Sequence, residues 1–240
     1  MSKPILINKT LKNFNKKINV EGDKSLSIRF ALLASQAIGK SRAFNLLKSE
    51  DVLSTLNCLK KLGVKIVKKK NTYIVYGNGL GSFKSPKKKL LYAGNSGSLA
   101  RMLLALIAAH KNLKVKITGD SSLVKRDMKR IIDPLSKIGC NFYPKNKNTL
   151  PVTIEGTGMP LAQRHIENIG SAQVKSAILL AGLNTLGLTV IEEKKISRNH
   201  TENLLKAINA DIKIKKKKDS NLIFLRGKKN LYSFNLSIPG

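Results

Sequence analysis

A pattern of glycine, small polar residues, a cation and a long apolar stretch occurs three times in this chain. The copies begin at Gly22, Gly94 and Gly170, so they are 72 and 76 residues apart. Each copy predicts the start of a helix, because its polar residues suit an N-cap and the apolar residues after them suit a buried helix. Three units at one period predict one domain with pseudo-threefold symmetry.

Hydrophobic periodicity predicts the same order of elements in each unit. The first unit is expected to contain a strand at 17–20, a helix at 25–39, a strand at 42–46, a helix from Ser49 to Gly63, and strands at 64–67 and 73–76. The same β-α-β-α-β-β order is expected over 90–154 and 165–225, with Pro134 inside a helix. The first helix of each unit is apolar on nearly every side, which predicts three central helices with sheets outside them.

The starts of three central helices would converge at one end of such a domain. A helix N-terminus offers unpaired N–H groups and the positive end of the helix dipole, so this end is expected to bind anions. In the first copy, Lys24, Ser25 and Arg29 lie on the first two turns. A capped helix with solvated charges is the alternative, but two cations at one helix start repel each other unless they share an anion.

The net charge of +31 raises the question of a nucleic-acid surface. Only eight of the 45 basic residues are arginine and the aromatic content is 5%, whereas nucleic-acid binders use arginine and stacking aromatics. We interpret the charge as a compositional bias with a solvated surface. Cys58 and Cys140 are expected to be buried free thiols of a cytoplasmic protein, and no signal sequence or membrane-spanning run is found. The three histidines are too dispersed for a metal site.

Five segments resemble a known family in their order along the chain: 22–29, 94–98, 119–126, 171–177 and 197–202. They are similar to the 5-enolpyruvylshikimate-3-phosphate synthases. The resemblance implies transfer of the enolpyruvyl group of phosphoenolpyruvate to the 5-hydroxyl of shikimate 3-phosphate, with release of phosphate, in the biosynthesis of chorismate and the aromatic amino acids. It implies an inside-out α/β barrel domain and a reaction without metal, nucleotide or other cofactor, and no membrane or nucleic-acid partner.

The resemblance also assigns roles to individual residues. Contacts to shikimate 3-phosphate are implied for Lys24, Ser25, Arg29, Ser171, Ala172, Gln173 and Ser197. Contacts to phosphoenolpyruvate are implied for Lys24, Asn95, Gly97, Arg126 and Gln173, with Lys24 as the catalytic residue. Gly97 lies where the family's sensitivity to glyphosate is decided, so a sensitive site is expected. The chain departs from the family pattern at Glu21, Ile28, Asp127 and Asn199.

The last residues look like the opening of the family's next motif, so we expect this chain to be the N-terminal half of the enzyme. Residues 1–16 are expected to belong to a missing second domain, 17–236 to form the N-terminal domain, and 237–240 to start the crossover. This half is expected to fold alone with negligible turnover, because the family's acidic proton acceptor lies in the second domain. A monomer is expected at full length.

Two alternatives remain open at this point. One is an enolpyruvyl transferase acting on UDP-N-acetylglucosamine, which shares the fold. The other is a nucleic-acid-binding protein of related fold, such as the RNA 3′-phosphate cyclases. A P-loop ATPase is excluded, because Ala34 stands where the first glycine before Gly39-Lys40-Ser41 belongs.

Overall fold

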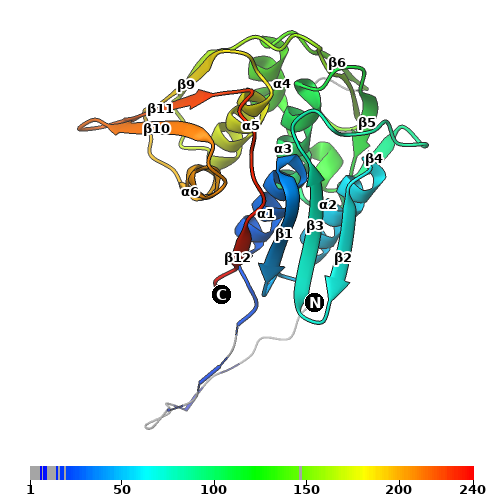
Figure 1. Ribbon diagram of the computed structural model, residues 1–240, viewed down its shortest axis with the longest axis vertical. Coiled ribbons are helices and arrows are strands. Elements are labelled where there is room, and N and C mark those ends of the chain that lie inside the picture. The colour runs from blue at the N-terminus through cyan, green and yellow to red at the C-terminus, as the bar shows by residue number, and fades with distance from the viewer. Residues whose placement is uncertain (1–5, 7, 10–14, 16, 19, 146–147) are drawn as a thin grey trace.

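The computed structural model describes residues 6, 8–9, 15, 17–18, 20–145 and 148–240 (Figure 1). These residues form six α-helices, one short 3₁₀-helix and twelve strands, and the strands make three four-stranded sheets. Most of the predicted segment 1–16 lies outside the described residues. Within the described ranges, no helix combines the length and the apolar character needed to cross a membrane.

The helices follow the predicted order, and the strands do so except at the start of the first unit. The helices are α1 (Lys24–Gln36), α2 (Glu50–Lys61), α3 (Gly97–Ala108), η1 (Leu123–Lys125), α4 (Lys129–Ser136), α5 (Ala172–Leu183) and α6 (His200–Ala207). The strands are β1 (Ile38–Phe44), β2 (Lys65–Lys69), β3 (Thr72–Asn78), β4 (Leu90–Tyr92), β5 (Lys114–Thr118), β6 (Asn141–Pro144), β7 (Val152–Glu155), β8 (Arg164–Glu167), β9 (Leu188–Glu193), β10 (Asp211–Lys216), β11 (Asn221–Arg226) and β12 (Asn235–Ser237).

The three sheets share one topology. Their strand orders are β12-β1-β3-β2, β4-β5-β7-β6 and β8-β9-β11-β10. In each sheet the first edge strand is parallel to its neighbour, and the other pairs are antiparallel. The prediction of three equivalent units is therefore confirmed for the sheets as well as for the helices.

The predicted strand at 17–20 is wrong. Lys17, Ile18 and Val20 lie outside any strand, and Asn19 lies outside the described residues. The parallel edge of the first sheet is formed by β12, with Ala43 opposite Leu236. The reason is burial: Phe234 packs on Phe30 with ring centroids 5.1 Å apart and Ile238 is 1% exposed, whereas Ile18 is 69% exposed.

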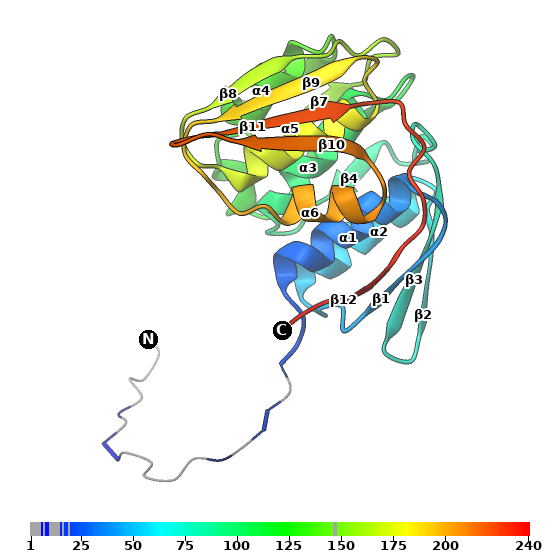
Figure 2. The ribbon, with the colours of Figure 1, turned by 60° about the vertical axis from the view of Figure 1, so that its left-hand side comes forward.

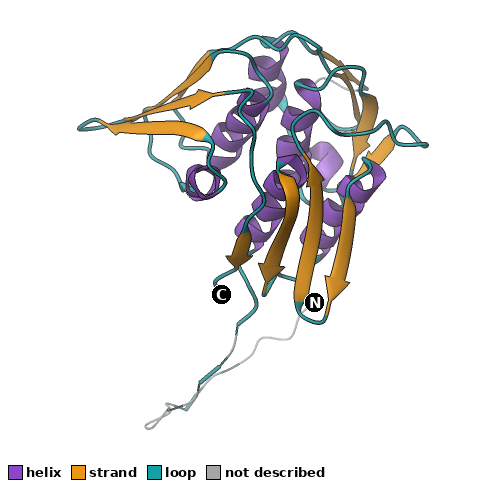
Figure 3. Cartoon of the chain, in the orientation of Figure 1, coloured by secondary structure: helices purple, strands orange, loops and turns teal. Residues whose placement is uncertain are grey.

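The helices lie inside and the sheets outside, as predicted (Figures 2 and 3). The core helices are α1, α3 and α5: every residue is buried over 27–36 of α1 and over 174–183 of α5. The α3 helix packs against both α1 and α5. The hydrophobic effect that drives this burial is the main source of stability for a domain of this kind.

Three glycines occupy equivalent places where a strand passes the end of a core helix. A Cβ atom at Gly77 would lie 2.1 and 2.2 Å from the carbonyl oxygens of Ala37 and Ala34 at the end of α1. Gly156 approaches the end of α3 in the same way, and Gly227 the end of α5, with distances of 2.1 to 2.3 Å. Only glycine fits these three positions without movement of the backbone.

Candidate active site

The starts of the three core helices converge on one face, as the repeat predicts. Two hydrogen bonds join neighbouring helices there. Arg29 on α1 donates from Nη2 to Ser176 Oγ on α5 at 3.0 Å, and Gln173 on α5 donates from Nε2 to Ser98 Oγ on α3 at 2.9 Å. The positive ends of three helix dipoles therefore lie together.

The first turns of these helices are capped in the same manner. The side chains of Asp23, Ser96 and Ser171 each accept a hydrogen bond from the backbone N–H three residues later. The remaining N–H groups of the first turns have no partner within the helix, which is the arrangement that favours a bound anion. Ser171, Ala172 and Gln173 lie at the start of α5 and are half-buried, and their contact with substrate remains a prediction.

Lys24 opens α1 and is held beside the helix start. Its Nζ lies 3.1 Å from Asp51 Oδ2 on α2, and its side chain is 53% exposed. Ser25 follows and is half-buried. The Asp51 carboxylate was not found by sequence reasoning, because nothing in the sequence shows that the start of α2 faces the start of α1. The pair leaves an exposed ammonium in a restricted position.

Asn95, Gly97 and Arg126 are also brought together. Arg126 donates from Nη2 to Asn95 Oδ1 at 2.7 Å, and Asn95 Nδ2 donates to Asp120 Oδ2 at 2.6 Å. A Cβ at Gly97 would lie 2.6 Å from Arg101 Nη1 and 3.3 Å from Arg126 Nη1. Two guanidinium groups thus lie over this glycine, and only a residue without a Cβ leaves both of them in place.

Arg101 is a second cation of this group that the residue assignments missed. It donates to the carbonyl oxygens of Gly97 and Asp127, both at 3.2 Å. Burial and the nearby Arg126 lower the pKa of its guanidinium. The available signal was its place one helical turn after Gly97.

Arg29 is more buried than we expect of an exposed side chain that binds an anion. Its side chain is nearly buried, with the residue 5% exposed, and it donates to Thr201 Oγ1 at 2.8 Å as well as to Ser176 and to the Ser25 carbonyl. Burial, and then the charge of Arg198, lower the pKa of Arg29 to about 10, so it stays charged near pH 7. It joins α1, α5 and α6, and a contact to substrate remains a prediction.

The cation of the third copy, Lys175, does not lie on this face. It is fully buried, with Nζ 2.7 Å from Glu193 Oε1 and 2.7 Å from Glu202 Oε1. Burial tends to raise the pKa of Glu193, but hydrogen bonds from Lys175, Ser197 and Asn221 outweigh it and hold that pKa below its usual value. The repeat pattern gave the position of Lys175 along α5 correctly, but it did not show that the side chain points into the core, toward Glu193 and Glu202.

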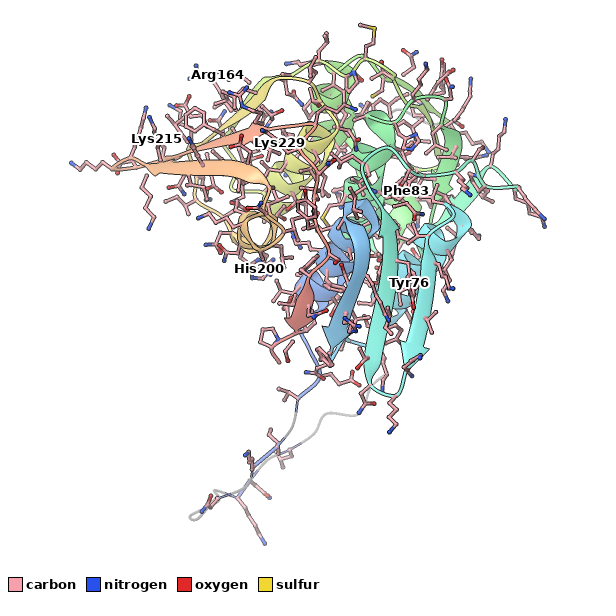
Figure 4. All side chains as sticks on the ribbon, in the orientation of Figure 1. Tyr76, Phe83, Arg164, His200, Lys215 and Lys229 are labelled. Atoms are coloured by element: carbon pink, nitrogen blue, oxygen red, sulfur yellow. The ribbon has the colours of Figure 1, made fainter. Side chains whose placement is uncertain are left out.

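Ser197 lies on the loop between β9 and α6 and is tied to the same carboxylate. Its backbone N–H and its hydroxyl both donate to Glu193 Oε1, at 2.8 and 2.7 Å. A cavity of about 710 Å³ opens beside this loop, lined by Ser197, Arg198 and Lys206 among others. His200, labelled in Figure 4 at the start of α6, has its pKa lowered by burial and then by the charge of Arg29.

The described residues thus form an inside-out α/β domain of three equivalent units, with the starts of its three core helices on one face. The family model for EPSP synthase (3-phosphoshikimate 1-carboxyvinyltransferase) matches residues 9–240. The chain belongs to the EPSP synthase family.

Relatives of the chain agree with this result. A 3-phosphoshikimate 1-carboxyvinyltransferase of Granulibacter bethesdensis is 38% identical over 92% of this chain and 49% of the relative. A 3-phosphoshikimate 1-carboxyvinyltransferase of Sulfurihydrogenibium is 40% identical over 96% of this chain and 53% of the relative. The structure of EPSP synthase from Acinetobacter baumannii superposes with a TM-score of 0.86 and 36% identity, covering 93% of this chain and 49% of that one. The chain therefore spans about half the length of the relatives it matches.

Proposed function

We propose that this protein acts in the transfer of the enolpyruvyl group from phosphoenolpyruvate to the 5-hydroxyl of shikimate 3-phosphate, and that it supplies contacts to both substrates. The observation that carries this proposal is the convergence of three helix starts: α1 bears Lys24, α5 bears Gln173, and the guanidinium of Arg126 lies beside Gly97 at the start of α3. Family membership supports the choice of substrates. The matched relatives carry the shikimate name, so a UDP-sugar acceptor or a nucleic-acid ligand is not favoured.

The chemistry suits a surface of fixed positive charge. The hydroxyl adds across the double bond of phosphoenolpyruvate, with its oxygen on C2 and a proton on C3. Loss of phosphate from C2 and of a proton from C3 of the tetrahedral adduct then restores the double bond. Both reactants are anions, so the protein must hold like charges together and stabilise the charge that develops. We assign the first task to the helix starts with Ser25, Ser171 and Ala172, and the second to the ammonium of Lys24.

The other assigned contacts divide by position. Gln173 lies between α5 and α3, so we place it against both substrates. Asn95, Gly97 and Arg126 form the phosphoenolpyruvate side, and Arg29 and Ser197 complete the shikimate 3-phosphate side. As domains, we assign 17–236 to the N-terminal domain, 1–16 to a second domain and 237–240 to the start of the crossover between them.

The cell compartment and assembly state are part of the same proposal. Cys58 and Cys140 are free and buried in the structure, which suits a reducing compartment, and we place the protein in the cytoplasm. We expect a monomer at full length.

The test is a calorimetric titration of the chain with shikimate 3-phosphate. Lys24→Met should weaken binding about tenfold or more, because a charge-assisted hydrogen bond to the ligand is lost. Lys114→Met is the matched control: its side chain is 52% exposed and its Nζ lies 2.9 Å from Glu155, much as Lys24 lies beside Asp51. The control should bind as the wild type does. Absence of binding by the wild-type chain, or equal losses in both variants, would contradict the proposal.

A further inference from the structure

A cluster of buried charges lies behind Ser197 and has no assigned role in the site. It consists of Lys175, Glu193 and Glu202, with exposures of 0%, 1% and 2%. The Lys175 ammonium lies between the two carboxylates at 2.7 Å from each. Together with Arg29, which is hydrogen-bonded to Thr201 beside Glu202, two buried cations balance two buried carboxylates. Lys175 needs at least one of these carboxylates, because a buried charge without any partner is strongly destabilising.

The two carboxylates differ in what else they contact. Glu193 Oε1 accepts the ammonium of Lys175 and both donors of Ser197, and Glu193 Oε2 accepts from Asn221 Nδ2 at 3.1 Å. Glu202 contacts Lys175 through Oε1, and its Oε2 has no hydrogen-bond partner among the residues that the structure describes. The two residues therefore have the same charge and burial and share one cation, but only Glu193 holds Ser197.

Ser197 depends on Glu193 for its position. Residues 194–199 form an exposed connection between β9 and α6, in which Lys194 N donates to the Glu167 carbonyl at 2.9 Å. Between that bond and the start of α6, both donors of Ser197 are held by one carboxylate oxygen. Without the carboxylate, the loop would sample other conformations, and ordering it on binding would cost free energy.

We propose that Glu193, fixed by Lys175, is the positioning residue for Ser197 in the shikimate 3-phosphate site; this rests on the function proposed above. The backbone N–H of Ser197 stays on Glu193 and fixes the loop. The hydroxyl can donate one hydrogen bond, and it donates this bond to Glu193 when the site is empty. It turns to a phosphate oxygen of the ligand when the ligand binds.

A competing role for Glu193 would change the anion affinity in the opposite direction. If Glu193 only competed with the phosphate for the donors of Ser197, or acted only through its negative charge, its removal would strengthen anion binding. If Glu193 positions Ser197, its removal weakens anion binding in spite of the lost negative charge. The direction of the change separates the two roles.

The experiment compares Glu193→Gln with Glu202→Gln in this chain. Each removes one buried negative charge that is 2.7 Å from Lys175 and leaves the other carboxylate to pair with it. The first readout is amide hydrogen exchange at Ser197 without ligand. Exchange should be at least about tenfold faster in Glu193→Gln than in the wild type, because a hydrogen bond that protects the amide is lost, and close to wild type in Glu202→Gln.

The second readout is a titration with shikimate 3-phosphate and, separately, with inorganic phosphate. Glu193→Gln should raise the Kd for shikimate 3-phosphate about tenfold, and Glu202→Gln should not raise it. Tighter binding by Glu193→Gln, or equal behaviour of the two variants in exchange and affinity, would overturn the inference. If the wild type binds neither probe, the proposed function fails while the exchange result still decides whether Glu193 positions Ser197.

Discussion

Gly156 gives the sharpest test of how the sheets pack on the core helices. In Gly156→Ala the new Cβ would lie 2.2 Å from the His110 carbonyl oxygen and 2.3 Å from that of Ile107. Both atoms are backbone at the end of α3, so neither can turn away. Either the strand or the helix end must move by about 1 Å to reach ordinary van der Waals separation.

The cost follows from what this movement disturbs. Overpacking of this kind costs about 1–3 kcal/mol. The shift also strains the hydrogen bonds from Gly156 N to Leu113 O and from Thr157 N to Ala108 O, both 3.0 Å, at about 1 kcal/mol each. We expect a loss of about 3–5 kcal/mol in the free energy of unfolding, a large part of the total for a domain.

Urea denaturation followed by circular dichroism measures this loss. With a slope of about 2 kcal/mol per molar urea, the midpoint should fall by about 1.5 M or more. Gly158→Ala is the control, because its Cβ would meet the flexible side chain of Lys111 at 3.1 Å, and its midpoint should hardly change. Equal midpoints in the two variants would refute the reasoning, and Gly77→Ala and Gly227→Ala should repeat the loss seen at Gly156.

Two further predictions concern side chains near and away from the site. Gly97→Ala should change the free energy of unfolding by less than about 1 kcal/mol, because its Cβ meets the ends of flexible arginines. Its NMR spectrum should show moved Nε signals of Arg101 and Arg126, and unmoved signals would contradict the geometry. Burial raises the pKa of Cys58 to about 11 and that of Cys140 to about 12, so both thiols should resist a thiol reagent at pH 8 until urea unfolds the chain. Rapid labelling of the native chain would show that they are accessible.

The helix starts could be predicted from sequence because their signals are local. A glycine, a capping residue and an apolar run lie within a few residues of one another, and Ser96 and Ser171 cap their helices as such a pattern requires. The convergence of the starts then follows from three equal units around one core. The residue roles assigned by resemblance remain predictions, although the structure places Lys24, Gly97 and Gln173 at the helix starts.

Other features could not be predicted because they depend on distant partners. The edge strand β12 pairs with β1, which is almost 200 residues earlier in the sequence, as in the pair of Arg42 with Asn235. Nothing in the sequence near Lys17 shows that β12 occupies the edge of the first sheet. Lys175 has the spacing of an anion-site cation, but its partners lie 18 and 27 residues further on, at Glu193 and Glu202. Helical spacing fixes the position of a side chain along a helix and does not show which neighbour neutralises its charge.

The β12 strand has a consequence for how the chain folds. Arg42 pairs with Asn235, so the first sheet to be started during synthesis is completed only after the strands of the other two sheets have been made. Contacts of such long sequence separation slow folding. Until then β1 has an open edge, and open edges are sites of aggregation in folding intermediates. The first sheet is thus completed late, and before β12 pairs with β1 the nascent chain is most exposed to aggregation and most in need of a chaperone.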